Sequence, residues 1–545
     1  MIKIKYSAVK LINIKYFNVG SFLLISKMMV KKYLFNISNI KTRFDKKNML
    51  QLSNYRYQHF RLTDQQYTGT SKVILEIVVQ SKEAIIIINE YLNRKHYYLK
   101  KGKNKIEVPI TALEQGENVL AYKGKIKIKY LSFCKLMHSN ESDISNNNVL
   151  LIHIGDNYLQ AAVQYINNSL VEYPLHSPFK NSCYAIYDYD NQCFRMSYWL
   201  WSDAPIVYAL LKLSEKDSIN KHFYISLASK IGDTLLRNQI LDKKDSNYGA
   251  LVSRYRYLGS ADNSFDCLLG VNDTSFAVKW ALLSLYKHTG LIEYLNASKI
   301  ALDWVVKAIY ENEFVPSHFY HEKGKREDGC FIDTGFTTEG LAEYNRIIID
   351  KKNVVYSNAI NFFMRRFLKQ FQLKNGFYGQ YYSFKNGISH KLFTRGHGWV
   401  LEGLIASYKE TKNHNYLNAA TSLGELLILE QEIDGSWPYL LGYVYPLTSV
   451  KKYSGKCEKA TALLSYLFIE LYKLTNNNKF IYCSKKAIAW CERNMNSENG
   501  KGYGGIASKN LASGITGLPF IKTATGYANA FYIISKLMHE ELEAL

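Results

Sequence analysis

The sequence has 545 residues, a hydrophobic fraction of 47% and a formal net charge of +22. This length is too great for one small core and predicts two domains, or one large repeat domain with an accessory. The apolar content, with 14% aromatic residues, excludes a mainly disordered chain. Residues 1–150 hold 26 Lys+Arg against 10 Asp+Glu, and the other 395 residues hold 43 against 37. Because most of the chain is nearly balanced in charge, we do not expect a nucleic-acid enzyme.

The N-terminal residues and the cysteines indicate the compartment. The apolar stretch Phe17–Ile25 is short and lacks a small-residue cleavage site, so a signal peptide is not favoured, and translation could also start at Met28 or Met49. No apolar run approaches the roughly 18 residues that span a bilayer. The eight cysteines form no Cys-x-x-Cys pair and are expected to be reduced. We therefore expect a cytoplasmic protein without a membrane span.

Strand-like runs follow a poorly defined N-terminal segment, residues 1–69. Residues 70–138 contain β-branched and alternating runs, which predict a small antiparallel β-sandwich of the kind attached to carbohydrate enzymes. These runs are Val73–Val79, Ala84–Glu90, Asn104–Ile110 and Lys123–Tyr130. Their lysines fall on the polar face, which is either simply solvated or a docking surface for an acidic polymer. Residues 139–149, rich in Ser and Asn, are the expected linker.

From residue 150 to residue 545 the pattern is one of repeated helix pairs. The element Tyr-Lys-x-Thr begins at residues 286, 408 and 472, and steps of 122 and 64 residues correspond to two repeats and one. Each unit reads as helix, polar turn, helix, then a loop rich in Gly and aromatic residues. With a helix at Asp156–Leu170 and a final helix starting near Thr525, the count comes to about six hairpins.

Six such hairpins predict a closed ring. One hairpin cannot bury its own apolar face, so the units must pack side by side. The first helix of each pair is apolar and rich in small residues nearly all round, as in Ala277–Leu285 and Ala460–Leu467. A helix of this kind is buried on every side. We therefore predict a mainly α protein, an (α/α)6 toroid with inner and outer helices, rather than an open solenoid.

Acidic residues recur where the inner helices of this ring begin. These positions are Asp203, Asp273, Asp333 and Glu458, and one repeat has an Arg395, His397 and Trp399 set instead. An Asp before a helix is also a good N-cap, which stabilises by about 1 kcal/mol. This purely structural explanation, an N-cap, has most weight at Asp203. In a ring the helix starts converge on one mouth, so we expect these side chains to share a cavity.

Two carboxylates, an Arg and aromatic rings are what sugar chemistry needs. One carboxyl can donate a proton, a second can hold or activate water, and Arg can pair with the carboxylate of an acidic sugar. Aromatic faces stack on pyranose rings. The loops supply such rings, although some will only pack the wall: Trp199, Trp201, Tyr378, Tyr381, Trp437 and Tyr439.

The stretch Arg395-Gly-His-Gly-Trp399 resembles the Arg-Gly-x-x-Trp motif of the unsaturated glucuronyl and rhamnogalacturonyl hydrolases, which are six-hairpin toroids. The resemblance covers roughly residues 150–540. It implies that Asp333 is the general acid that protonates the double bond of a 4,5-unsaturated uronic acid, with Asp273 as its carboxylate partner. Water then adds and the hemiketal opens to release the sugar. The resemblance implies no metal and no organic cofactor.

The same resemblance implies a sugar-binding subsite built by Arg395 and Trp399, to which the mouth pattern adds further substrate-binding candidates. These candidates are His397, Asp203, Trp201, Gln380, Tyr381, Glu458 and Trp437. The family usually places a His-bearing aromatic loop before the Arg motif, but here the stretch 376–383 contains no His. Gln380 or His390 could substitute. The expected partner is an anionic oligo- or polysaccharide.

Other functions fit the same residues. A conventional glycosidase, a uronosyl epimerase or lyase, or a non-catalytic protein of surface polysaccharide assembly would also use a toroid with this mouth. His318 and His321, with Glu322, have metal-ligand residue types, but no further ligand follows at a characteristic spacing, so a metal site is not predicted.

Overall fold

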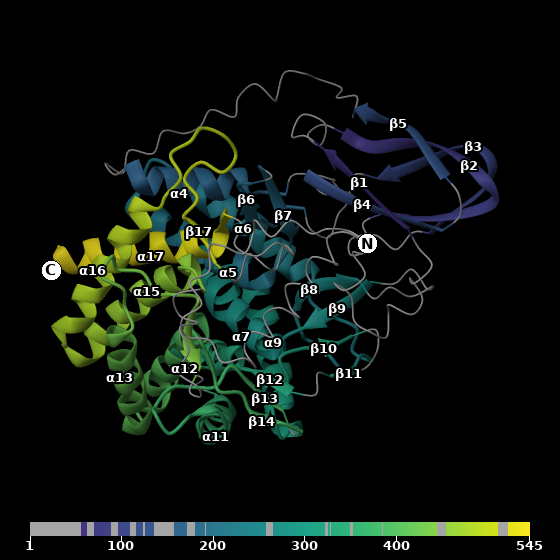
Figure 1. The fold of residues 1–545 in the computed structure, drawn as a ribbon. Helices are drawn as coiled ribbons and strands as arrows, with labels where there is room; N and C mark the ends of the chain where they lie inside the picture. Colours follow the sequence, from purple (N-terminus) through teal and green to yellow (C-terminus); the bar gives the residue numbers. More distant parts are fainter. Residues whose placement is uncertain are drawn as a thin grey trace, which may run out of the picture.

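The computed structural model describes most of the chain from residue 56 onward (Figure 1). The described ranges are 56–62, 70–88, 96–109, 116–123, 126–135, 157–171, 180–190, 192–257, 265–321, 325–326, 329–348, 353–383, 385–443, 454–510 and 522–544. Residues 1–55 and 136–156, which include the signal-peptide candidate and the expected linker, lie outside them. Among the described residues, no helix is long and apolar enough to cross a membrane.

The N-terminal strands form one antiparallel network. Its strands are β1 (Arg56–Leu62), β2 (Thr70–Ile88), β3 (His96–Pro109), β4 (Gly116–Lys123) and β5 (Ile126–Lys135). The two runs expected at 73–79 and 84–90 belong to the single long strand β2, whose pairing with β3 is irregular between Val79 and Glu83. Strands β3, β4 and β5 pair with β2, and β1 pairs with β4, so all five strands belong to one sheet. The expected antiparallel strands are therefore present, while a β-sandwich stays a prediction.

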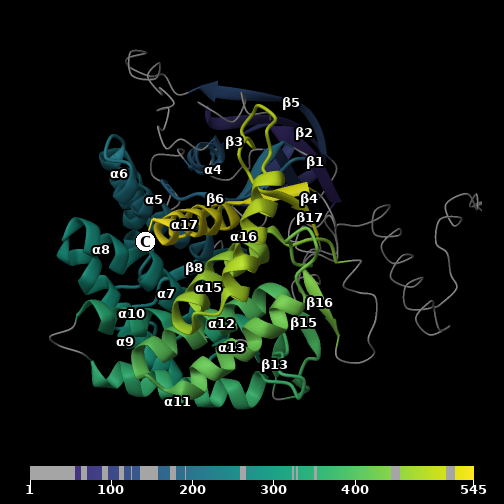
Figure 2. The same ribbon diagram turned by 90° about the vertical axis from the view of Figure 1, so that its left-hand side faces the viewer.

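Six inner helices form the wall of a ring, and six outer helices surround it (Figures 1 and 2). The inner helices are α5 (Leu200–Lys216), the continuous run α7 (Val271–Ala277), η4 (Val278–Leu282) and α8 (Leu283–Thr289), then η5 (Ile332–Phe336) with α10 (Glu339–Ile347), α12 (Thr394–Thr411), α15 (Glu458–Thr475) and α17 (Gly526–Glu543). The outer helices are α6 (Lys221–Arg237), α9 (Ile292–Glu311), α11 (Val354–Phe371), α13 (His414–Leu429), α16 (Asn478–Arg493) and α4 (Asn157–Asn168).

The ring closes through the two ends of the helical region. Each inner helix packs against the next, and α17 packs against both α15 and α5. The helix expected at 156–170, which is α4, packs against α17, so the sixth hairpin joins the first and last helices of the ring. The expected closed toroid is therefore observed in the described residues, and the open solenoid is not.

Small residues let the inner helices approach closely, as their composition predicts. A Cβ atom added to Gly403 of α12 would lie 1.8 Å from the backbone oxygen of Gly335 in η5. Next to this contact, the Thr338 hydroxyl donates to the carbonyl of Gly403 across 3.3 Å. Any larger residue at position 403 would force the two helices apart. Helix spacing in the wall is thus set by backbone-to-backbone contact.

The Tyr-Lys-x-Thr repeats end inner helices, as expected. Thr289, Thr411 and Thr475 each donate a hydroxyl hydrogen bond of 2.7 Å to the carbonyl four residues earlier. The next residue adopts a left-handed conformation in all three copies: Gly290 at φ 73°, Lys412 at φ 57° and Asn476 at φ 56°. Each of these residues donates its amide to the Tyr carbonyl of the motif across 2.8 Å, which closes the last turn.

Short strands precede the inner helices and line the mouth. They are β6 (Tyr184–Asp188) and β7 (Cys193–Ser197), β8 (Val252–Tyr257) and β9 (Phe265–Leu269), β10 (Phe319–Tyr320) and β11 (Lys325–Arg326), β12 (Gly329–Phe331), β13 (Tyr381–Ser383) and β14 (Gly387–Ile388), β15 (Lys391–Phe393) and β16 (Leu440–Tyr443), and β17 (Ala507–Lys509) and β18 (Lys522–Thr525). Strand β18 pairs with β6, which joins the chain end to the first repeat.

A buried carboxyl ties this strand layer to the first inner helix. Asp203 accepts from the Ser182 hydroxyl at 2.7 Å and from the Cys183 amide at 3.0 Å. It lies in the first turn of α5, whose N-cap is Trp199, so the N-cap reading of Asp203 is wrong. Complete burial raises the pKa of Asp203 to about 7, against the two hydrogen bonds that favour its charged form.

The left-handed helix ends predict opposite effects of two substitutions. Gly290→Ala should lower the free energy of unfolding by about 1 kcal/mol, because the left-handed backbone conformation is unfavourable for Ala. A Cβ atom at this position would contact no other atom, so it neither clashes nor adds packing. Lys412→Gly should raise it by about 0.5 kcal/mol, because strain is relieved and only part of the gain is lost to chain entropy. Denaturant unfolding of both variants measures this. Shifts of the same sign would contradict it.

The Asp203 pKa predicts a pH-dependent difference between wild type and Asp203→Asn. The folded pKa lies above the unfolded value, so between pH 4 and pH 7 the folded state binds more protons, and this group's stabilising contribution is lost as pH rises. The stability of wild type relative to Asp203→Asn should therefore fall by on the order of 4 kcal/mol from pH 4 to pH 8. Thermal unfolding across that range measures it. A difference that stays constant would contradict it.

Candidate active site

Two aspartates and an arginine lie at the starts of neighbouring inner helices, as the repeat pattern predicts. Asp273 is in the first turn of α7, Asp333 is in η5, and Arg395 is in the first turn of α12. The three elements are successive in the ring, because α7 packs on η5 and η5 packs on α12. The mouth of the toroid therefore brings these three residues to the same side.

Asp273 is almost completely buried, with 5% of its surface exposed. Burial raises the pKa of its carboxyl above the ordinary Asp value, while the charges of His318, Arg254 and Arg395 and a hydrogen bond from Ser253 act in the opposite direction. Gly270 is the N-cap residue of α7, so Asp273 does not cap this helix. A buried carboxyl with a raised pKa is a candidate for proton transfer.

One short segment connects the two aspartates. The hydroxyl of Ser317 donates to Asp333 across 3.2 Å and also accepts from the amide of Phe331. The next residue, His318, interacts electrostatically with Asp273 and lowers the pKa of its carboxyl. Adjacent residues of one segment therefore interact with both aspartates. Asp333 is the more accessible of the two.

Arg395 is held in a cage of aromatic rings. Its guanidinium carbon lies 4.6 Å from the centre of the Trp399 ring, 5.1 Å from Trp201 and 5.7 Å from Tyr527. The side chain is only 8% exposed, yet its Nε and Nη1 atoms have no hydrogen-bond partner among the described residues. Leaving the donors of a buried guanidinium unpaired is costly, and an anion is a ligand that could satisfy them.

Trp399 and Trp201, both predicted to contact a sugar, lie beside Arg395. Both are partly exposed, and both contact Tyr527 of α17: the Trp399 indole donates to its hydroxyl at 3.3 Å, and Trp201 meets its ring edge to face. Tyr527 was not predicted, although it opens the last inner helix as Arg395 opens another. Repeat position alone was the signal that could have found it.

His397 and Trp437, both predicted to contact substrate, are hydrogen-bonded within the framework. Both side chains are fully buried. The Nδ1 of His397 bonds to the Phe393 carbonyl at 2.8 Å and its Nε2 accepts from the Tyr378 amide at 3.1 Å, and burial lowers the pKa of His397 to about 4. The indole of Trp437 donates to the Leu427 carbonyl at 2.8 Å. These contacts favour a structural role for both residues.

Asp203 and Glu458 are likewise fully buried and satisfied by the framework. The two oxygens of Asp203 accept hydrogen bonds from Ser182 and Cys183. Glu458, the first residue of α15, pairs with Lys459 and accepts from Ser508 and from Asn510, the latter across 2.8 Å. Their placement at helix starts follows the repeat, but their carboxylates are already occupied by protein donors.

The loop that lacks the expected His lies directly beside Asp333. The Gln380 carbonyl accepts from the Ile332 amide at 2.9 Å, and Tyr381 pairs in register with Phe331, whose ring it meets at 5.0 Å. Gln380, Tyr381 and His390 are all partly or more fully accessible. Gln380 and Tyr381 therefore remain candidates for contact with a sugar bound over Asp333.

His318 and His321 point to different partners rather than to one metal ion. His318 faces Asp273, whereas His321 Nε2 bonds to Asp245. Glu322 lies outside the described residues. No group of three His, Cys, Asp or Glu in the described part of the chain could hold a metal. His318, Ser317, Ser253 and Arg254 were missed as mouth residues because they come from strand and loop segments that do not share a repeat position.

Comparison with known proteins identifies the fold and nothing finer. No protein-family model and no curated protein matches the chain. Among solved structures, an unsaturated glucuronyl hydrolase specific for heparin is similar at 14% identity and TM-score 0.54, covering 71% of this chain and 97% of its own. The unsaturated glucuronyl hydrolase of Bacillus sp. GL1 follows at 12% identity and TM-score 0.54, covering 70% and 96%.

A third structure with the same ring has a different activity. Cellobiose 2-epimerase from Bacillus thermoamylovorans is similar at 14% identity and TM-score 0.52, covering 70% of this chain and 99% of its own. At identities this low, the substrates of these enzymes cannot be transferred to this chain. The structural similarity shows the fold alone, and the resemblance seen in the sequence is confirmed at that level: the chain shares the α/α-toroid fold of these structures.

Proposed function

We propose that the protein is a hydrolase of 4,5-unsaturated uronyl oligosaccharides. The observation that carries the proposal is the caged Arg395, with unused buried donors, beside the Asp273 and Asp333 pair at one mouth. Arg395 would bind the uronate carboxylate, since a guanidinium matches a carboxylate in shape and charge. Trp399 and Trp201 would flank the sugar ring.

Asp333 is proposed as the general acid and Asp273 as its partner. The more accessible carboxyl of Asp333 can reach the double bond of the substrate, while Ser317 fixes its orientation. Proton transfer to the double bond, followed by addition of water, gives a hemiketal that opens and releases the sugar. Asp273, with its pKa raised by burial, is suited to exchange a proton with that water.

A uronosyl epimerase or lyase is the second candidate. It is favoured by His318 beside Asp273, because a His and carboxylate pair can abstract a proton next to a carboxylate. The absence of a His in the loop 376–383 points the same way. Such an enzyme would exchange the C5 hydrogen of a saturated uronosyl unit with deuterium oxide, without consuming an unsaturated substrate.

Asp333→Asn should abolish turnover of unsaturated disaccharides. Loss of the general acid should lower kcat by about 10²- to 10⁴-fold, because Asn cannot donate the proton. The near-ultraviolet absorbance of the substrate's conjugated double bond measures this directly. Asp303→Asn, on the outer helix α9, is the matched control and should keep wild-type turnover. If Asp333→Asn keeps its activity and Asp273→Asn loses it, the assignment is contradicted and Asp273 is the general acid.

Arg395→Leu should weaken binding of acidic substrates selectively. Removal of a buried charge partner costs about 2–5 kcal/mol, so kcat/KM for a uronate substrate should fall by at least tenfold. The same reaction with the substrate carboxylate converted to a carboxamide should change little between wild type and variant. Equal losses on both substrates would show that Arg395 supports the fold of the mouth and does not select the anion.

A further inference from the structure

A second cavity lies at the opposite end of the ring from the mouth. Its volume is about 710 Å³, and residues of all six inner helices line it. It includes Lys287 and Lys412 at the C-terminal ends of inner helices, both exposed, so it opens to solvent at that end. This volume falls within the range of about 300–1,000 Å³ that is typical of small-molecule sites. We call it the rear cavity.

A layer of aromatic side chains separates the rear cavity from the mouth. Phe276 contacts Phe336 with ring centres 5.1 Å apart, and Phe336 contacts Trp399 at 5.7 Å. Across the ring, Phe531 contacts Tyr527 at 4.8 Å and Trp280 at 5.2 Å. The two spaces are therefore distinct, and the proposed function of the mouth does not use the rear cavity.

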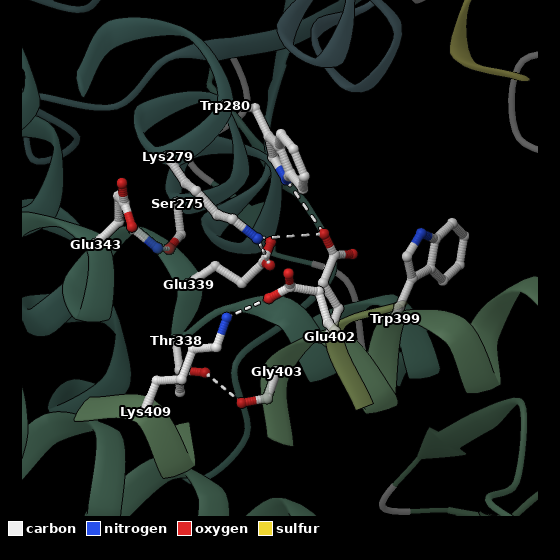
Figure 3. Close-up of polar contacts among 12 residues, drawn as sticks. Ser275, Lys279, Trp280, Thr338, Glu339, Glu343, Trp399, Glu402, Gly403 and Lys409 are labelled. Atoms are coloured by element: carbon white, nitrogen blue, oxygen red, sulfur yellow. Dashed lines mark hydrogen bonds and ion pairs between the residues drawn. The ribbon is translucent and has the colours of Figure 1, made fainter. Parts of the chain in front are cut away.

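A buried polar cluster forms the inner end of the rear cavity (Figure 3). Lys279 lies between Glu339 and Glu402. It forms an ion pair with Glu339, and its Nζ is 3.5 Å from the Oε1 of Glu402. The indole of Trp280 donates to the same oxygen of Glu402 across 3.2 Å. The cluster thus joins three consecutive inner helices, and it lies roughly two helical turns below the mouth residues.

The cluster has unused polar atoms. The Oε2 atoms of Glu339 and Glu402 are both buried without a hydrogen-bond partner in the described part of the chain. A carboxyl oxygen can accept a hydrogen bond, and a hydroxyl group is a donor that satisfies it. Burial and the charge of Glu339 also raise the pKa of Glu402 well above its ordinary value.

The local helix geometry also indicates a functional site at the cluster. Lys279 and Trp280 lie in the π-helical turn η4, which interrupts the inner helix at this one place. Such turns cost hydrogen-bond quality and occur frequently at functional sites. Here the turn places the cluster's cation and indole side by side, with Lys279 Nζ 4.1 Å from the centre of the Trp280 ring.

The charges around the opening do not select an ion. Seven Lys or Arg and six Glu line the rear cavity, and most pair with one another, as Lys212 does with Glu541 and Lys409 with Glu470. A strongly anionic or cationic ligand would gain little from charges that are mostly paired already. The aromatic rings of Tyr208 and Tyr466 complete the lining.

We propose that the rear cavity binds an uncharged, hydroxyl-rich small molecule of the size of a mono- or disaccharide, with Glu339 and Glu402 as its polar anchor. The unused carboxyl oxygens at the inner end, the largely paired charges of the wall and the aromatic rings together fit a neutral sugar. This site is independent of the hydrolase proposal and would stand if the mouth had another activity.

Calorimetric titration of the full chain tests this site. The probes are glucose, galactose, N-acetylglucosamine and cellobiose, with glucuronate and glucosamine as charged counterparts. At least one neutral sugar should bind saturably. Glu402→Gln should bind within about threefold of wild type, because the amide keeps an acceptor oxygen. Glu402→Leu should bind at least tenfold more weakly, because that acceptor is lost.

A second variant keeps the test valid if Glu402→Leu does not fold. Ala406→Phe fills the rear cavity from α12, one helical turn beyond Glu402, without replacing a residue of the cluster, and should abolish binding. Ala419→Phe on the outer helix α13 is the matched control and should bind as wild type does, as should Asp333→Asn. The proposal is overturned if no neutral sugar binds at tens of millimolar. It is also overturned if Ala406→Phe binds normally or a charged sugar binds tenfold more tightly than every neutral one.

Discussion

Each inner helix of the ring is surrounded by other helices, so every charge that it carries must find a partner inside the ring. Burying an unpaired ion costs several kcal/mol, and an α/α toroid with a compact wall leaves only two places where polar groups can meet solvent or ligand. These are the mouth, where the inner helices begin, and the rear cavity, where they end. Arg395 and the Lys279 cluster occupy these two places.

The same constraint separates framework carboxylates from candidate functional ones. Asp203 and Glu458 are buried with protein donors on their oxygens, and they hold strands and helices together. Asp333 accepts from Ser317 and is partly exposed, while Asp273 is buried and interacts with positively charged groups. Two buried nitrogens of Arg395 have no hydrogen-bond partner in the described part of the chain. The exposure of Asp333 and the unused donors of Arg395 therefore distinguish these residues from the framework carboxylates.

The fold was predictable because it depends on periodic features that a single sequence displays. Tyr-Lys-x-Thr marks the same turn three times, and small residues at positions such as Gly403 mark doubly buried helices. The mouth was predictable only where its residues share a repeat position, as Asp273, Asp333 and Arg395 do. His318 and Ser317 come from a loop between repeats, and Lys279 with Glu402 forms a cluster only after three helices pack, so periodicity could not reveal them.

The central claim is that the mouth receives an anionic sugar through Arg395. A crystal structure of Asp333→Asn with an unsaturated uronyl disaccharide tests this most directly. The account predicts that the uronate carboxylate lies within hydrogen-bond distance of Arg395 Nε or Nη1, with its ring against Trp399. A sugar bound in the mouth with its carboxylate directed to solvent, and Arg395 still without a hydrogen-bond partner, would contradict it.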